Sequence, residues 1–176
     1  MNWHDFRMPR EKRIHGGGDP MTIVIRRASP HDLDLIAPLF DAYRCFYAQP
    51  SDLQRAHDWL QTRMQSDESV VLLAEREGRA CGFTQLYPMF SSVRTARLWI
   101  LNDLFVAEDA RRAGVARALL DAAAQFARED GAAGIMLETA RDNAAARALY
   151  LAAGWNEDAS QWYSLALAPA TPSAAG

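Results

Sequence analysis

Long apolar runs, cysteine patterns and an excess of either charge are all missing from this 176-residue sequence. Without a run of about 18 apolar residues it offers no transmembrane helix, and its N-terminus lacks the apolar centre of a signal peptide. Cys45 and Cys81 are its only cysteines and form no C-x-x-C pattern, which favours a reduced, cytoplasmic protein. The formal net charge of −3 argues against a general nucleic-acid binder, whose surface carries a basic excess. We therefore expect neither nucleic acid nor a membrane as a partner.

Metal-ligand spacing and internal repeats are missing as well. His4, His15, His31 and His57 are scattered along the chain, so we predict no metal site. What is present is ordinary for a globular protein, with 49% hydrophobic and 23% charged residues. The length suits one domain with a real core.

The two ends of the chain differ from its middle. Residues 1–20 are polar, mixed in charge and end in Gly-Gly-Gly-Asp-Pro, so we expect a flexible extension. Met21 opens the first convincing strand and is an alternative candidate for the native start. Residues 169–176 are rich in Ala, Pro and Ser, and we expect a disordered tail. A single domain is therefore predicted over 21–168.

Within that domain the hydrophobic pattern predicts alternating strands and helices. Strands are expected over 22–27, 69–75, 80–87, 98–106, 134–138 and 162–168, and helices over 29–48, over 51–65, from 115 and from 143 to the glycine at 154. Ser29, Ser51 and Asn143 are the expected helix caps. The segment 88–95 is predicted to be a loop. This order gives an α/β (or α+β) fold with a mixed sheet flanked by helices, and its central antiparallel strands exclude a Rossmann fold.

A basic loop stands between the strand 98–106 and the next helix. Its sequence is Arg111-Arg112-Ala113-Gly114-Val115-Ala116, and an apolar stripe of Val115, Leu119, Ala122 and Phe126 follows it. Free backbone N–H groups and the dipole at a helix start favour anions, and arginine matches phosphate oxygens. The loop therefore predicts a phosphate-bearing ligand. The alternative is an ordinary strand–turn–helix with a solvated arginine pair.

Two motifs together carry a resemblance to a known family. The first is Arg111-x-x-Gly114-x-Ala116, and the second is Asn143-x-x-Ala146-x-x-x-Tyr150-x-x-x-Gly154-Trp155. Both resemble, in the same order, motifs of the GNAT superfamily of acyl-CoA-dependent N-acetyltransferases, and the similarity covers roughly residues 22–168. The departures are Ala116 for the commoner Gly and Trp155 for the commoner Phe.

The resemblance implies a cofactor, a sheet geometry and an assembly. The cofactor is acetyl-CoA, its pantetheine arm enters between two splayed strands of a mainly antiparallel sheet, and the protein forms a homodimer. The residues that this likeness assigns to cofactor binding are Leu104, Phe105, Val106, Arg111, Arg112, Ala113, Gly114, Val115, Ala116, Arg117, Asn143 and Tyr150. Tyr150 is also the expected general acid for the departing thiolate, since a phenol can donate that proton. Its alternative is a plain core tyrosine.

The residues offer more than one candidate for the base that deprotonates the amine. Asn102 stands where polyamine-acetylating relatives carry Glu, and an amide cannot accept the proton. Asp103 is therefore the candidate base, although strand alternation predicts that it points away from Asn102. Its alternative role is to brace a neighbouring loop. Tyr87 and Glu138 are weaker candidates that would act through water.

The acceptor is expected to be a primary amine: a polyamine, an amino acid or a lysine side chain. The strand 98–106 and the helix with Phe46 and Tyr47 resemble the subgroup that contains polyamine and small yeast amine/histone acetyltransferases. Tyr47, Tyr87 and Asn102 are the expected acceptor contacts, within an aromatic wall that attracts a cation. Core or dimer packing is the plainer role for these aromatic residues. Direct transfer is expected because neither cysteine has a nucleophile's setting, and the competing function is a non-catalytic acyl-CoA-binding regulatory module.

Overall fold

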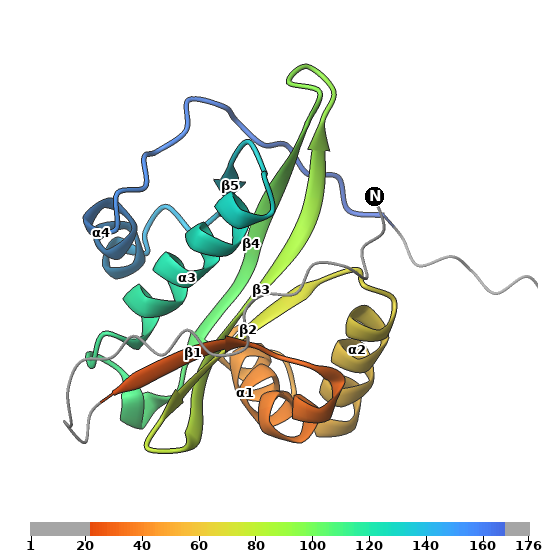
Figure 1. Ribbon diagram of the computed structural model, residues 1–176, viewed down its shortest axis with the longest axis vertical. Helices are drawn as coiled ribbons and strands as arrows, with labels where there is room; N and C mark the ends of the chain where they lie inside the picture. The colour runs from red at the N-terminus through yellow and green to blue at the C-terminus, as the bar shows by residue number, and fades with distance from the viewer. Residues whose placement is uncertain (1–21, 168–176) are drawn as a thin grey trace, which may run out of the picture.

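A five-stranded sheet in the order β1-β2-β3-β4-β5 forms the centre of the computed structural model, which describes residues 22–167 (Figure 1). The strands are β1 Ile23–Arg27, β2 Val70–Arg76, β3 Arg79–Ser91, β4 Ala96–Val106 and β5 Ile135–Met136. All neighbours pair antiparallel except β4 and β5, which are parallel. The mixed, mainly antiparallel sheet predicted from the sequence is thus confirmed.

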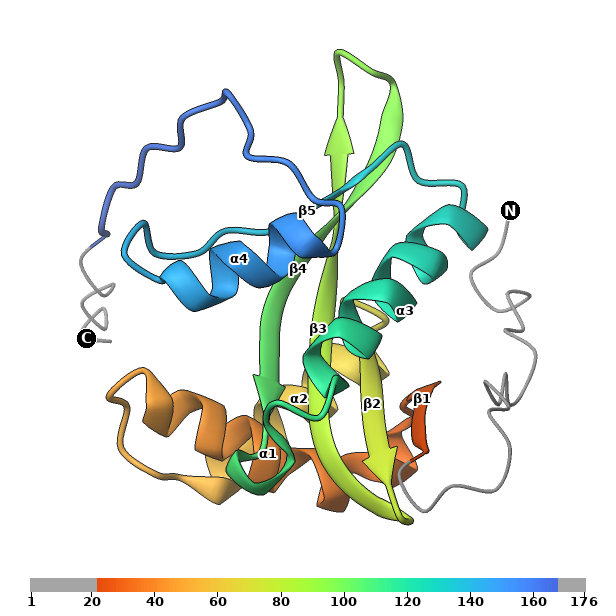
Figure 2. The same cartoon turned by 90° about the vertical axis from the view of Figure 1, so that its left-hand side faces the viewer.

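Helices cover both faces of this sheet (Figure 2). The helices α1 Leu33–Phe46 and α2 Leu53–Gln65 pack on one face, and α3 Val115–Glu129 and α4 Ala144–Ala152 pack on the other. A short 3-10 helix, Pro30–Asp32, leads into α1, and another, Glu108–Ala110, precedes the basic loop. The predicted capping box is present, with the Ser29 N–H donating to Asp32 Oδ2 over 2.8 Å.

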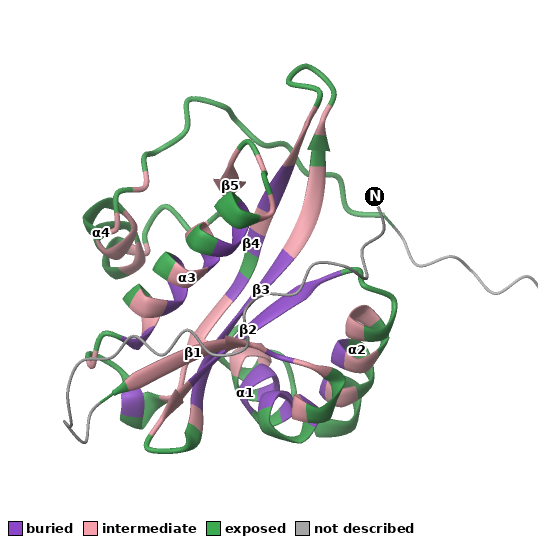
Figure 3. Cartoon of the chain, in the orientation of Figure 1, coloured by how far each residue is buried: buried purple, intermediate pink, exposed green. Residues whose placement is uncertain are grey.

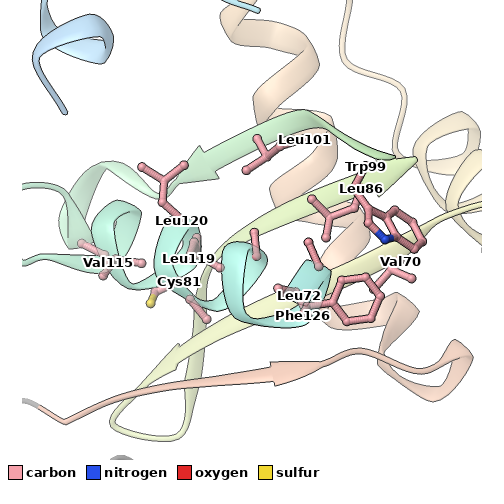
Figure 4. Packing of buried hydrophobic residues seen from close by; sticks show 14 residues of the cluster. Val70, Leu72, Cys81, Leu86, Trp99, Leu101, Val115, Leu119, Leu120 and Phe126 are labelled. Carbon is pink, nitrogen blue, oxygen red and sulfur yellow. The ribbon is translucent and has the colours of Figure 1, made fainter. Parts of the chain in front are cut away.

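The apolar residues form two buried clusters, one on each face of the sheet. Figure 3 marks the buried residues of the strands and helices in purple. β2 belongs to both clusters, because Leu72 faces one cluster and Leu73 faces the other. The cluster under α3 is shown in Figure 4, where Trp99 packs edge-on against Phe126 at 5.0 Å between ring centroids. The stripe predicted for α3 is what docks this helix on the sheet.

The sheet opens between β4 and β5. Their ladder has two pairs, Trp99 with Ile135 and Ile100 with Met136, whereas β4 continues to Val106. From Leu101 onward, that side of β4 carries no paired strand within residues 22–167. The predicted splay of two central strands is therefore confirmed.

The predicted loop over 88–95 is wrong for its first half. β3 extends to Ser91, and the turn is confined to residues 92–95. Pro88 is tolerated in this strand because the ladder with β2 stops at the pair of Val70 and Leu86, so β3 has only one partner strand at Pro88.

The predicted last strand is not present in residues 162–167, and Ala168 lies outside the described residues. Trp162, Tyr163, Leu165 and Leu167 expose 63 to 87% of their surface. A segment with alternating apolar residues forms a strand only where it can pair with a neighbouring strand and bury one face. β5, with two residues, offers too short an edge for such pairing. The expected strand over 134–138 is likewise shorter, leaving Glu138 exposed beyond it.

Ser51 is not the cap of α2. Asp52 caps this helix, its side chain accepting the Arg55 N–H at 3.0 Å. Ser51 donates instead to Asp41 Oδ2 over 2.5 Å, because this buried carboxylate also needs donors. The expected caps Asn143 and Gly154 are confirmed, Gly154 with φ +84° after α4. The predicted extension 1–20 and the tail 169–176 lie outside the described residues.

No helix among the residues that the structure describes is long and apolar enough to cross a membrane.

Candidate active site

The basic loop and the first turn of α3 line a pocket of about 220 Å³. Gly114 caps α3 in the left-handed region, with φ +86°. A Cβ on Gly114 would meet nothing closer than Ile23 Cδ1 at 4.0 Å, so backbone conformation rather than space requires glycine here. The lining residues are Val106, Ala110, Arg111, Arg112, Gly114, Val115, Ala116, Arg117 and Leu149. Seven of these were assigned from the sequence to the cofactor.

The N-terminus of α3 is held tightly against β3. A Cβ on Gly82 would come within 2.8 Å of the Phe105 carbonyl oxygen and 3.3 Å of Val115 Cγ1. The first intrahelical bond runs from the Ala118 N–H to the Gly114 carbonyl. The preceding N–H groups of the helix are therefore left for a ligand, and the dipole makes this end attractive to anions.

The three arginines of the loop have different settings. Arg111 Nε donates to the Val106 carbonyl over 3.1 Å and its guanidinium lies 6.0 Å from the Phe105 ring centroid. Arg112 is exposed. Arg117 pairs with Asp121 at 2.9 Å and donates to the Ala152 carbonyl over 2.7 Å, which joins α3 to the end of α4. All three arginines are exposed, and Arg112 is the one whose guanidinium is not already engaged by another group in residues 22–167.

Asp103 lies beside a β-bulge in β4. Gln85 pairs with Asp103 and Leu86 with Leu101, so Asn102 is the extra residue. The expectation that strand alternation separates Asn102 from Asp103 is wrong, because Asn102 Nδ2 donates to Asp103 Oδ1 over 3.1 Å. Asn102 is exposed, whereas Asp103 is only 5% exposed.

The partners of the Asp103 carboxylate are both uncharged. They are the amide of Asn102 and the hydroxyl of Tyr43, which donates from α1. Burial raises the pKa of Asp103, and these two hydrogen bonds oppose that rise. Within residues 22–167, no cationic side chain pairs with this carboxylate, and it braces no loop.

Tyr43 belongs to an aromatic cluster, 43–47, that the sequence suggested as part of the wall around the amine, but sequence reasoning did not connect it with Asp103. Its ring packs edge-on against Phe83 at 6.1 Å and Phe105 at 6.3 Å between centroids, which fixes it over the sheet. Its hydroxyl is hydrogen-bonded to both Asp103 and Tyr47, and burial is the main cause of its raised pKa. The available signal was the four-residue spacing of Tyr43 and Tyr47, which puts both on one side of α1.

The other predicted acceptor residues flank Asp103. Tyr47 is 59% exposed and stacks edge-on with Tyr43 at 5.1 Å. Tyr87 is hydrogen-bonded to Trp59 of α2, and its pKa is raised by burial and, less strongly, by the Asp103 charge. Both tyrosines therefore belong to the same side of the sheet as the carboxylate. Trp162 and Tyr163 lie instead in the exposed segment near the end of the chain.

Tyr150 comes from the opposite face. It is half-buried on α4, hydrogen-bonded to Thr139, and 6.4 Å from Trp155 between ring centroids. Burial raises the pKa of its hydroxyl, and the next contribution comes from Tyr47 of α1. Tyr150 of α4 and Tyr47 of α1 are therefore close enough to influence each other electrostatically.

Asn143 holds the start of α4. Its Oδ1 accepts the Ala146 N–H at 3.2 Å, and its Nδ2 donates to Thr139 Oγ1 at 3.4 Å. Thr139 belongs to no motif, and no sequence signal marked it. Among residues 22–167, no three His, Cys, Asp or Glu side chains gather where they could hold a metal ion.

Known proteins share this chain's sequence and fold. Residues 36–155 match the Acetyltransferase (GNAT) family. The uncharacterized N-acetyltransferase YhfO of Bacillus subtilis (strain 168) is 50% identical over 134 residues, which are 76% of this chain and 90% of that protein. A probable acetyltransferase of Haemophilus influenzae is 36% identical over 101 residues, 57% of this chain and 69% of its own length. A crystal structure of a probable acetyltransferase is 43% identical, with a TM-score of 0.78, over 82% of this chain and 98% of that one.

The chain therefore belongs to the GNAT family, and it is an acetyltransferase. Members of this family generally use acetyl-CoA.

Proposed function

We propose that this acetyltransferase transfers the acetyl group of acetyl-CoA directly to a primary amine. The observation that carries the proposal is that Asp103 and Tyr150, on opposite faces of the sheet, are connected through two tyrosines of α1. Tyr43 contacts Asp103, Tyr47 influences Tyr150, and the two rings pack edge-on at 5.1 Å between centroids. Asp103 suits proton removal and Tyr150 suits proton delivery.

The loop pocket fits the phosphates of the cofactor. It combines free N–H groups at the start of α3 with the exposed Arg112, which is the chemistry that a pyrophosphate requires. The unpaired side of β4 over Leu104, Phe105 and Val106 offers backbone groups that can pair with an extended amide-bearing arm. When bound, acetyl-CoA supplies an acetyl group activated as a thioester.

Asp103 is the proposed base. An amine attacks only after its ammonium form has lost a proton, and the carboxylate takes that proton. Burial raises the pKa of Asp103, which makes it a stronger base than an exposed aspartate. An incoming ammonium also supplies the positive charge that the buried carboxylate lacks among its partners.

Tyr150 is the proposed acid. When the nitrogen–carbon bond forms, the carbon–sulfur bond breaks, and the Tyr150 hydroxyl gives its proton to the departing sulfur. Cys81 does not fit a covalent route, because it is 7% exposed and burial raises the pKa of its thiol. Direct transfer is therefore the route that the site supports.

The acceptor class follows from the walls around Asp103. Tyr47 and Tyr87 present aromatic surface, and Asn102 presents an exposed amide beside the carboxylate. Aromatic faces and a carboxylate both attract a cation. A polyamine, an amino acid or a lysine side chain meets this requirement.

The test measures free thiol release from acetyl-CoA across polyamines, amino acids and lysine peptides. Tyr150→Phe should lower kcat by about 100-fold while the affinity for acetyl-CoA stays within about twofold. Tyr163→Phe, which removes a phenol hydroxyl from the exposed segment, is the matched control and should not change kcat. An unchanged kcat in Tyr150→Phe would remove this residue from the acid role.

The expected homodimer remains part of the proposal, in a reduced, cytoplasmic setting. Trp162, Tyr163, Leu165 and Leu167 are an exposed apolar set that a second copy could cover. Light scattering on the full chain should give twice the monomer mass. Leu165→Glu with Leu167→Glu should give the monomer, and a wild-type monomer at all concentrations rejects the dimer.

A further inference from the structure

We infer that Asp41 is a positioning residue for the amine acceptor, because it holds the turn 47–52 between α1 and α2. The inference rests on the proposed function, in which Tyr47 is an acceptor contact. It starts from a carboxylate that the proposed mechanism does not use. Asp41 lies in α1, and only 8% of its surface is exposed.

Three residues donate hydrogen bonds to the Asp41 carboxylate. The Ser51 hydroxyl donates to Oδ2 over 2.5 Å, and the Asp52 N–H donates to Oδ1 over 2.8 Å. Arg44 Nη1 donates to Oδ1 over 3.0 Å and also to the Asp52 carbonyl over 3.4 Å. These hydrogen bonds, the one from the Asp52 N–H first, hold the pKa of Asp41 below its usual range. The ionised carboxylate therefore ties α1 to the residues where the turn ends.

The turn needs such an anchor because its start is strained. Tyr47 ends α1, with its N–H donating to the Arg44 carbonyl over 3.1 Å. Ala48 then has φ +59°, in the left-handed region, which is unfavourable for a residue with a Cβ. Strained backbone persists only where the surrounding structure determines it. The hydrogen bonds to Asp41 fix the far end of the turn and so hold this conformation.

The ring of Tyr47 takes its position from the end of α1. It is exposed, and it packs edge-on against Tyr43 at 5.1 Å and Phe46 at 5.3 Å between centroids. Both neighbours are residues of α1 itself, so these two ring contacts tie Tyr47 to nothing outside its own helix. The position of this acceptor contact is therefore set by the backbone of the turn, which Asp41 fixes.

Asp41 should therefore affect the binding of the amine and not that of the cofactor. The pocket proposed for acetyl-CoA is formed at the start of α3, on the other face of the sheet from α1 and α2. A change at Asp41 should raise the KM for the amine and leave the KM for acetyl-CoA unchanged. A loss of stability alone would not separate the two substrates in this way.

The experiment measures both KM values, with spermidine, lysine and a lysine peptide as acceptors. Asp41→Asn keeps the shape and removes the charge, and it should raise the amine KM by about tenfold. Its kcat and its KM for acetyl-CoA should stay within about twofold of wild type. Ser51→Ala, a milder change, should raise the amine KM by about fivefold, and Ser51→Thr, which keeps the hydroxyl, should restore it. The Ser51 pair tests the inference even if Asp41→Asn does not fold.

The matched control is Asp130→Asn. Asp130 is another carboxylate with little exposure, and it accepts from Arg97 Nη1 over 3.0 Å and from Trp99 Nε1 over 2.9 Å at the end of α3. Asp130→Asn should lower the melting temperature as Asp41→Asn does, and it should leave the amine KM unchanged.

A wild-type amine KM in Asp41→Asn and Ser51→Ala, beside a raised amine KM in Tyr47→Ala, overturns the inference and leaves the proposed function standing. An amine KM raised equally in Asp41→Asn and Asp130→Asn also overturns it, since that result indicates a general loosening of the fold. An unchanged amine KM in Tyr47→Ala rejects Tyr47 as an acceptor contact, and the inference with it.

Discussion

The two faces of the sheet contribute to the site in different ways. On the α3 and α4 face, the pocket and Tyr150 are positioned by local features, namely Gly114 before one helix and Asn143 at the start of the other. On the α1 and α2 face, Asp103 gains its environment from Tyr43, which is 60 residues away along the chain. A motif can record the first kind of site, because its residues are neighbours in sequence, whereas tertiary packing assembles the second.

The largest effect is expected on the α1 and α2 face, which we call the packed face, from Asp103→Asn. Loss of the proposed base should lower kcat/KM by about 100- to 10,000-fold. In the wild type, the active form is the carboxylate, so activity should fall as the pH drops through a pKa that burial has raised. The measurement is a kcat/KM–pH profile for both proteins with one amine.

Stability should move in the opposite direction in the same variant. A carboxyl group whose folded pKa is raised destabilises the fold as pH rises from its unfolded pKa through its folded pKa. Asn carries no charge, so Asp103→Asn should melt no lower than wild type at pH 7. A large drop in melting temperature together with lost activity would instead make Asp103 a structural residue.

The next prediction tests the α3 and α4 face, which we call the local face, with Gly114→Ala. Alanine in the left-handed region costs about 1–2 kcal/mol, so the loop should rearrange and the KM for acetyl-CoA should rise by about tenfold. Gly131→Ala is the matched control, because Gly131 has φ +72° just after the other end of α3 and no atom within 4 Å of its would-be Cβ. If both variants lose similar stability but only Gly114→Ala raises the KM, cofactor binding is located at the loop. Equal KM values in the two variants would contradict it.

The same division explains what the sequence could predict. Residues 114–116 predicted the loop, and residues 143–154 predicted a helix with its cap and its end. These predictions were possible because glycine favours a positive φ and asparagine caps helix starts, whatever the rest of the fold does. The orientation of Asp103 could not be deduced in the same way, since a bulge at Asn102 interrupts strand alternation and only the pairing with β3 reveals it. Tyr43 looked like one aromatic residue among several until the fold placed it against that carboxylate. Pro88 led to the prediction of a loop, because proline is unfavourable inside a sheet. The sequence does not reveal that β2 is absent beside Pro88, since that depends on how the strands pair.

A smaller effect is expected from Tyr43→Phe, which keeps the aromatic packing and removes one hydroxyl. Asp103 would lose a hydrogen bond that lowers its pKa, leaving Asn102 as its donor and Tyr87 as its other titratable neighbour. The acidic limb of the kcat/KM profile should therefore move to higher pH, with a loss of about three- to tenfold near neutrality. Activity should recover at high pH, where Asp103 is ionised in both proteins. A loss that is the same at every pH would show that Tyr43 acts through packing and not through the carboxylate.

The smallest effect on catalysis is expected where α1 begins, at Asp32. Its carboxylate accepts the Ser29 N–H in the capping box of the short 3-10 helix before α1, and it pairs with Arg26 at 2.7 Å. Mainly through the hydrogen bond from Arg26, the pKa of Asp32 is lowered to about 2. This group therefore stabilises the fold above the ordinary aspartate pKa, and that contribution disappears as pH falls from about 4 toward about 2. Asp32→Asn should lower the free energy of unfolding by about 1 kcal/mol at pH 7 and by much less at pH 2.5, with kcat unchanged. If kcat fell as well, the placement of Tyr43 would depend on the start of its helix, and the packed face would be more sensitive to remote changes than the local one.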